Sequence, residues 1–185
     1  LIYTVLADFT MTSDMINNWH LINTIAPSVI FDGNNKTITV DTGQDWEGLF
    51  KPSNISDGTF EITNLTLDFK DNIKENYGGF ISTSYIDDST SISGYQINIY
   101  NCKSITNNGK SIGINGGGIV GRNFYKGTLQ YCYNNLSINQ NAGGICGGYT
   151  GQADDGITLR YCYCEASVLS NSSSGIVGTD GISGN

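Results

Sequence analysis

Three related runs in the C-terminal half of the chain decide the fold: INIYNCKSI at 97–105, LQYCYNNLSI at 129–138 and LRYCYCEASV at 159–168. Each run alternates apolar and polar residues up to a cysteine, and Cys102, Cys132 and Cys162 recur at intervals of 30 residues. Alternation with a period of two, in segments rich in isoleucine, leucine and tyrosine, predicts strands with one buried face. The even spacing indicates that these strands are copies of one repeating unit.

A glycine-rich apolar step follows each of these runs. The steps read GGGIVG at 116–121, GGICGG at 143–148 and SSGIVG at 173–178. Weaker copies lie upstream, with EITNLTLDF at 61–69 before GGFIS at 78–82, and FDGNNKTITV at 31–40 before EGLF at 47–50. One long strand and one short strand therefore alternate every 26 to 39 residues or so, a period typical of solenoids and other repeat arrays.

The local chemistry selects an all-β fold, a right-handed parallel β-helix, among the solenoids. Helical periodicity is missing, which excludes ankyrin, tetratricopeptide and HEAT arrays, and a propeller blade needs four strands per unit. Successive coils of a β-helix place equivalent strands about 4.8 Å apart, so that equivalent inward residues stack. We therefore predict two ladders of buried side chains: Cys102, Cys132 and Cys162 in one, and Phe80, Ile119, Ile145 and Ile176 in the other.

Glycine and asparagine are expected at the bends between strands. The glycines before the ladder positions allow either a positive φ or a close approach of two backbone segments. Asparagine tolerates the left-handed conformation. Asn64, Asn101 and Asn134 are therefore predicted to mark the bends at strand ends.

The whole chain, residues 1–185, is predicted to form a single β-helix domain. Residues 1–27 are expected to be an N-terminal cap with a short helix that ends near Trp19, and an irregular first coil is the alternative. Residues 28–178 hold the repeat coils, and 179–185 begin a further coil or tail. Because an uncovered final coil exposes unpaired backbone groups, we expect more chain or another subunit to cover it.

Composition and charge exclude several classes of function. The chain has 185 residues, of which 14% are charged, and its net charge is −8 at pH 7. Affinity for nucleic acid depends on clustered lysine and arginine, and the sequence has no such cluster, so nucleic acid is not an expected partner. No apolar run approaches the 18 residues of a membrane-spanning helix, so no membrane insertion is expected. The opening LIYTVLADF does not read as an intact signal peptide.

The five cysteines are expected to be reduced and partly buried. Their odd number argues against a complete disulfide framework. Cys162 and Cys164 form a C-x-C pair, but two thiols and a single histidine do not complete a metal site. We therefore predict no metal and no cofactor, and a reducing compartment for synthesis or residence.

The repeat resembles a known family. NC at 101–102, GGIVG at 117–121 and the upstream GLF at 48–50 are similar to the glycine-rich NCY/GGIVG β-helix repeats of the GLUG type. FDGNNKTITV at 31–40 is similar to the opening coil of many right-handed parallel β-helix proteins. Such repeats occur in bacterial surface proteins and adhesins, and similar arrays occur in large DNA viruses of protists. The resemblance covers roughly residues 29–178, departs from the pattern in a long loop at 71–95, and implies the fold. It does not select a function, because this architecture hosts lyases, hydrolases, adhesins and capsid components alike.

Two aspartate pairs are the candidate catalytic residues. Enzymes of this fold act mostly on polysaccharides, and cleavage of a glycosidic bond needs two carboxyl groups held about 5 to 10 Å apart. Asp87 with Asp88 and Asp154 with Asp155 lie in loops before long strands, and stacked loops would bring the pairs within two coils. The same carboxylates could hold calcium. As pairs of loop residues they also fit solvated turns, and this is the interpretation that we prefer.

A few arginine, histidine and tyrosine side chains are further candidates for a binding role. Arg122 and Arg160 are the only arginines and could bind an acidic sugar, but solvated surface positions are the interpretation that we prefer. His20 is interpreted as a cap residue, because no serine or cysteine partner accompanies it. Four tyrosines, Tyr131, Tyr133, Tyr161 and Tyr163, could form a strip on which sugars stack.

The sequence favours a non-enzymatic structural module in a virus particle or on a cell surface, acting in assembly or attachment. Its expected partners are other structural subunits, or further copies of itself through the ends and faces of the solenoid. The alternative is a carbohydrate-active enzyme or sugar-binding module on the same scaffold, with surface carbohydrate as the partner. The expected location is the virus particle, with the cell surface or extracellular space as the alternative.

Overall fold

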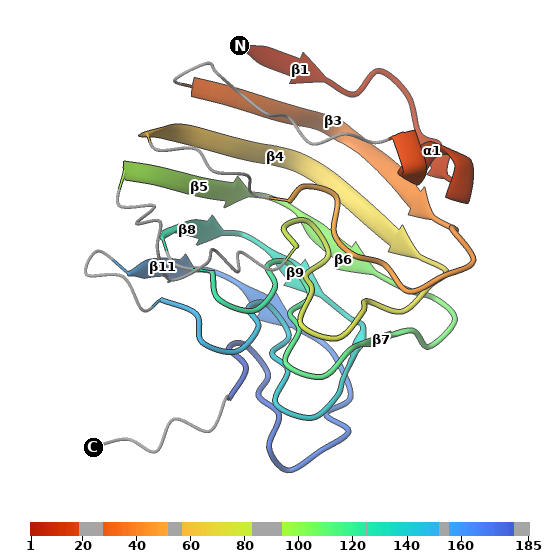
Figure 1. The fold of residues 1–185 in the computed structure, drawn as a ribbon, viewed down its shortest axis with the longest axis vertical. Helices are drawn as coiled ribbons and strands as arrows, with labels where there is room; N and C mark the ends of the chain where they lie inside the picture. The colour runs from red at the N-terminus through yellow and green to blue at the C-terminus, as the bar shows by residue number, and fades with distance from the viewer. Residues whose placement is uncertain (19–27, 52–56, 83–93, 125, 152–155, 180–185) are drawn as a thin grey trace.

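The computed structural model describes residues 1–18, 28–51, 57–82, 94–124, 126–151 and 156–179. Over these residues the chain folds as a parallel β-solenoid of about four turns, with one short helix near the N-terminus (Figure 1). The predicted all-β solenoid is therefore confirmed. All pairings between the described strands are parallel, as coils wound in one direction require.

The elements are short except for two strands near the N-terminus. In chain order they are β1 (Ile2–Thr4), β2 (Phe9–Met11), α1 (Ser13–Asn18), β3 (Ser28–Val40), β4 (Asp57–Phe69), β5 (Gly94–Tyr100), β6 (Lys103–Ile105), β7 (Ser111–Ile112), β8 (Gly127–Gln130), β9 (Tyr133–Asn134), β10 (Ser137–Ile138), β11 (Ile157–Arg160) and β12 (Tyr163–Cys164).

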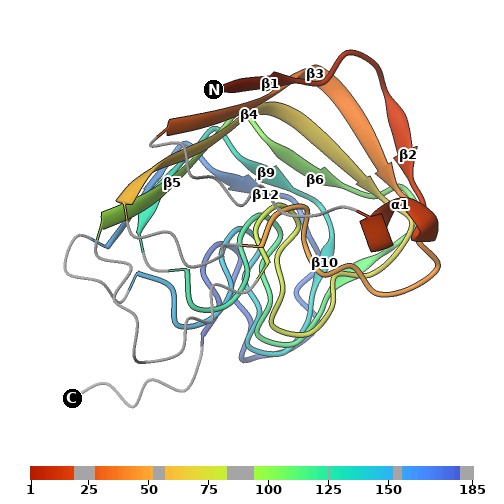
Figure 2. The same cartoon turned by 45° about the horizontal axis from the view of Figure 1, so that its top comes forward.

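One wall of the solenoid carries the long strands and sets the register of the stack. β3 pairs with β4 along most of its 13 residues, and β4 then pairs with both β5 and β6. The same wall continues through β8 and β9 to β11 and β12, and Figure 2 shows it as one curved layer. This register stacks apolar inward residues of successive turns, namely Phe31, Ile62, Ile99, Leu129 and Leu159.

The remainder of each turn consists of single bridges and two-residue strands. One bridged row runs through Trp46, Ile73, Ile112, Ile138 and Val168. A second row runs through Phe50, Ile81, Val120, Cys146 and Val177. These rows face the long wall and enclose the core with it (Figure 2). The core is apolar and closely packed, with Trp46, Phe69 and Phe80 fully buried.

The predicted bends are found at two of the three asparagines. Asn64 and Asn101 have φ of 54° and 52°, and they occupy equivalent corners of neighbouring turns. Tyr131 and Tyr161 take over this corner in the next two turns, with φ of 56° and 52°. The prediction for Asn134 is wrong, because this residue ends β9 without a positive φ and its side chain is buried.

The described part of the N-terminal segment holds two short strands and a helix. The helix α1 spans six residues directly after Thr12, close to its predicted position. Before it, β1 and β2 pair with β3 and add an irregular coil at this end of the stack. Met11 is fully buried, whereas Leu1, Ile2 and Leu6 are exposed. Trp19, His20 and Leu21 lie outside the described residues.

The paired glycines of the repeat are needed for close approach and not for an unusual φ. A Cβ added at Gly117 or Gly143 would lie well under 3.0 Å from backbone atoms of its own turn and the next. The following glycines face the long wall, so that a Cβ on Gly118 would meet Asn134, and one on Gly144 would meet the Sγ of Cys164. None of these glycines has φ in the left-handed region. At these glycines the backbone therefore lies too close to its neighbours for a side chain to fit.

We predict that Gly118→Ala destabilises the fold by roughly 1–3 kcal/mol or more, because overpacking at a rigid backbone contact must shift the wall. Gly175→Ala is the matched control: it occupies the equivalent place in the last turn and has no heavy atom within 4 Å of the added Cβ. Its cost should stay within about 0.5 kcal/mol. Urea unfolding of the two variants measures the difference, and equal losses would contradict the steric explanation.

Candidate functional site

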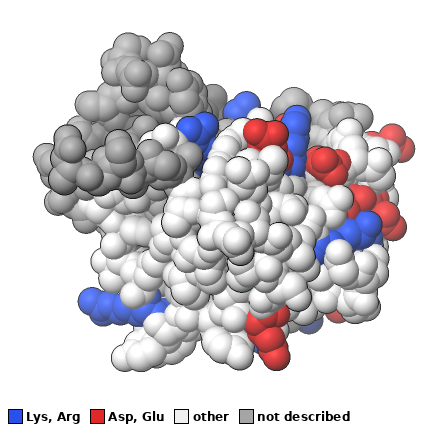
Figure 3. All heavy atoms as spheres, turned by 90° about the horizontal axis from the view of Figure 1, so that it is seen from below, with Lys and Arg blue, Asp and Glu red and all other residues white. Residues whose placement is uncertain are grey.

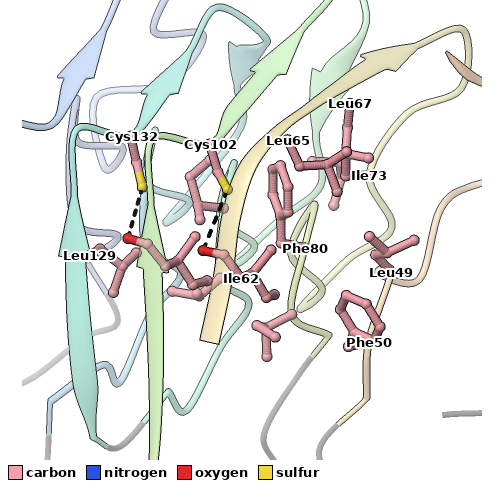
Figure 4. Close-up of a cluster of buried hydrophobic side chains, with 14 of the residues drawn as sticks. Leu49, Phe50, Ile62, Leu65, Leu67, Ile73, Phe80, Cys102, Leu129 and Cys132 are labelled. Carbon is pink, nitrogen blue, oxygen red and sulfur yellow. Dashed lines mark hydrogen bonds between the residues drawn. The ribbon is translucent and has the colours of Figure 1, made fainter. Parts of the chain in front are cut away.

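The three repeat cysteines stack at one inward position of successive turns. The neighbouring pairings Lys103 with Tyr133 and Tyr133 with Tyr163 align the residues that precede them. Each thiol donates a hydrogen bond to a carbonyl oxygen of the preceding turn: Cys102 to Ile62 at 3.8 Å, Cys132 to Ile99 at 3.5 Å and Cys162 to Leu129 at 3.5 Å. Figure 4 shows Cys102 and Cys132 side by side with their hydrogen bonds.

The three thiols differ in burial although their positions are equivalent. Cys102 and Cys132 are 0% and 1% exposed, whereas Cys162 is only partly buried. The expectation that all three are buried is therefore wrong for Cys162. Its turn has a described neighbour on one side only, so that its inward side chains keep contact with solvent.

The environment separates the pKa values of the thiols. Burial raises the pKa of Cys102 to about 12, and it raises the pKa of Cys146 and Cys164 as well. Interaction with the neighbouring Cys162 thiol, followed by burial, raises the pKa of Cys132. The same interaction lowers the pKa of Cys162 to about 7 against the opposing effect of desolvation. Cys162 is therefore the thiol with most thiolate character at neutral pH.

The second predicted ladder stacks through backbone hydrogen bonds. The Phe80 amide donates to the Ile119 carbonyl at 2.9 Å, the Ile119 amide donates to Ile145 at 3.0 Å, and Ile145 donates to Ile176 at 2.9 Å. Phe80, Ile119 and Ile145 are fully buried, whereas Ile176 is partly buried. Burial therefore decreases at the last described turn in this ladder too.

A polar inward stack lies two residues beyond the cysteines and was not predicted. Ser104, Asn134 and Cys164 align in register. The Ser104 Oγ donates to the Gly118 carbonyl at 2.5 Å, and the Asn134 amide group both donates to and accepts from the Leu136 backbone. Strand alternation places residues two apart on one face, so the spacing from each cysteine was the signal that could have found this stack.

The four tyrosines form two stacked pairs on the outside of the long wall. The rings of Tyr131 and Tyr161 lie 5.1 Å apart and nearly parallel, and those of Tyr133 and Tyr163 lie 5.9 Å apart. Tyr161 is 74% exposed, and the Tyr133 hydroxyl donates to Glu165 at 3.0 Å. This hydrogen bond adds to partial burial, which is the larger cause, in raising the pKa of Tyr133. The structure thus brings together the strip of tyrosines singled out in the sequence.

The acidic candidates Asp87, Asp88, Asp154 and Asp155 all lie outside the described residues. Arg122 stacks over the Tyr149 ring at 4.6 Å, and Arg160 is exposed in β11. Within the described ranges, no three histidine, cysteine, aspartate or glutamate side chains gather as the ligands of a metal ion would. In the same part of the chain, no helix has the length and apolar character needed to cross a membrane.

Comparison with protein-family models, with curated proteins and with solved structures found no match to this chain.

We predict that thiol reagents distinguish the cysteines in the folded protein. Cys162 should be alkylated first, with a rate that rises through pH 7 as its thiolate forms. Cys164, whose pKa is raised, should react only at higher pH, and Cys102, Cys132 and Cys146 should stay protected until unfolding.

The measurement is iodoacetamide labelling between pH 5.5 and 9.5, read by peptide mass spectrometry, with a urea-unfolded sample as the control for full reactivity. Rapid native labelling of Cys102 and Cys132 would contradict the buried ladder. Equal pH profiles for Cys162 and Cys164 would contradict the lowered pKa.

Proposed function

We propose that the chain is a non-enzymatic structural module, a rigid solenoid that acts in assembly or attachment in a virus particle or on a cell surface. The observation that carries this proposal is the face of the last described turn. Figure 3 views the molecule from that end and shows a largely uncharged surface, with acidic and basic side chains towards its rim. Its exposed apolar side chains include Val168 at 50% and Leu169 at 57%.

The exposure of this face follows from the repeat itself. Val168 occupies the row whose preceding members, Ile112 and Ile138, are fully buried. Val168 therefore occupies a position that is buried in the two preceding turns but contacts solvent in this one. Two neighbouring apolar side chains exposed on a largely uncharged face favour an interaction site there, and an open parallel edge favours a partner that continues the backbone pairing. Another structural subunit would supply both.

The thiols support the viral setting over a secreted one. The five cysteines are free, and those most buried have raised pKa values that suppress reaction. Proteins that mature in oxidising compartments commonly pair their cysteines. A ladder of unpaired thiols therefore favours assembly in a reducing cytoplasm, where large viruses can build their particles.

The exposed tyrosine pairs favour one second candidate, a carbohydrate-binding module. Tyr131, Tyr161 and Tyr163 present 54%, 74% and 58% of their surface to solvent, and stacking holds each ring in place. Fixed aromatic rings with hydroxyl groups bind partners at a low cost in side-chain entropy. The partner in this case would be a surface glycan.

For the structural role, we predict that Val168→Lys reduces association of the purified protein with its native assembly by tenfold or more, because it places a charge on the apolar face. Thr158→Lys is the matched control, since Thr158 is exposed on the outside of the same turn. Mass spectrometry of purified particles or envelopes first identifies the assembly, and co-sedimentation measures the association. Equal binding of both variants would remove the last turn from the interface.

For the second candidate, a glycan array probed with the wild type and Tyr161→Ala gives the decision. Loss of a glycan signal in this variant, with retention in Tyr3→Ala at the opposite end of the stack, would favour carbohydrate binding. Conversion of the glycan to shorter products by the wild type would overturn the non-enzymatic assignment.

A further inference from the structure

We propose that Cys162 and Cys132 form a redox pair, in which Cys162 is oxidised by hydroperoxides and Cys132 resolves the product as a disulfide. This modification site lies in the turn that the partner proposed above would cover, so it is accessible in the unassembled chain. Three observations carry it: the alignment of the two cysteines in neighbouring turns, their unequal exposure, and a nearby cysteine, Cys164, that is equally partly buried but has no thiol at the same position of the turn before it.

The proximity of the two cysteines follows from the register of the long wall. Gln130 pairs with Arg160, and Tyr133 pairs with Tyr163, so that Cys132 and Cys162 are held as neighbours between two fixed pairings. Adjacent parallel strands lie about 4.8 Å apart, inside the range of about 4.4–6.8 Å between Cα atoms that a disulfide spans. In this register the Cys132 thiol is near enough to Cys162 to lower the pKa of Cys162. A disulfide between Cys132 and Cys162 can therefore form without any change in the pairing of the strands.

The unequal exposure assigns a different role to each thiol. Cys162 is partly open to solvent, whereas Cys132 is 1% exposed beneath it. A small oxidant reaches the outer sulfur first and leaves the inner one as a protected thiol. An accessible thiol of low pKa next to a second thiol is the arrangement of redox-sensing cysteines. The Cys132 thiol donates to the carbonyl oxygens of Ile99 at 3.5 Å and Gln130 at 3.6 Å, and its proximity lowers the pKa of Cys162.

Cys164 provides an internal comparison. It lies on the same inward face two residues later and is also partly buried. Its neighbour in the preceding turn is Asn134, whose side-chain amide donates to the Cys164 sulfur at 3.6 Å. This position has no second thiol to resolve an oxidised sulfur, and burial raises the pKa of Cys164.

The chemistry has two balanced steps. The Cys162 thiolate attacks the distal oxygen of a hydroperoxide, breaks the O–O bond and becomes a sulfenic acid, while the alkoxide or hydroxide that leaves takes up a proton. The Cys132 sulfur then attacks the sulfenic sulfur, the S–O bond breaks, and the hydroxyl departs as water with the Cys132 proton. The two thiols are oxidised and the hydroperoxide is reduced. The new bond joins residues 30 positions apart and fastens the last described turn to the one before it.

The test treats the folded, reduced protein with hydrogen peroxide at pH 7 and maps the products by non-reducing peptide mass spectrometry. The expected product is a Cys132–Cys162 disulfide that dithiothreitol reverses. Cys162→Ser should abolish it, whereas Cys164→Ser should leave its yield within twofold of the wild type. In Cys132→Ser, Cys162 should accumulate as a sulfenic acid that dimedone traps.

Other products would contradict the proposed roles of Cys132 and Cys162. A disulfide from Cys162 to Cys146 or Cys164, or stable over-oxidation of Cys162 in the wild type, would overturn the assignment of Cys132 as the resolving thiol. Preferential oxidation of Cys164 would overturn the assignment of Cys162. Thermal unfolding checks that the variants fold, and the wild-type peptide map decides the matter even where Cys132→Ser does not.

Discussion

The rest of the molecule depends on one constraint, which is the close approach between the long wall and the backbone at the paired glycines. Gly79, Gly118 and Gly144 bring backbone against the inward stack of Ser104, Asn134 and Cys164. Because glycine has no Cβ, the backbone here can lie close to the long wall and still hydrogen-bond to the turns on both sides. The apolar ladders depend on this arrangement, since side chains of successive turns then stack at the spacing of paired strands.

Much of this fold was predictable from spacing alone. The cysteines at 30-residue intervals fix one inward position, and period-two alternation fixes its neighbours, so the ladder and the strands around it could be placed. The corner at Asn64 and Asn101 was predictable from the tolerance of asparagine for positive φ. The two tyrosines that replace asparagine at this corner give no such signal, because tyrosine has no intrinsic preference for that conformation.

The errors have local causes. In the turn of Asn134 the corner residue is Tyr131, so a prediction based on asparagine placed the bend three residues too late. The Asn134 side chain instead points inward, where it hydrogen-bonds to the Leu136 backbone. Cys162 was expected to match Cys132 because sequence repetition reports equivalent positions. Burial, however, depends on the neighbouring turn as well as on the position, and that neighbour is not encoded in the repeat unit itself. The unequal exposure of Cys132 and Cys162, on which the proposed redox pair depends, needed coordinates for the same reason.

The direction of the thiol hydrogen bonds has a consequence for how the molecule comes apart. Every thiol of the ladder reaches back to the turn before it, and pairing links each turn only to its immediate neighbours. Such a stack behaves as a one-dimensional chain of coupled units. Damage in one turn weakens two junctions and leaves the distant ones intact, so the solenoid should unzip stepwise from its least buried end and need not melt as a whole.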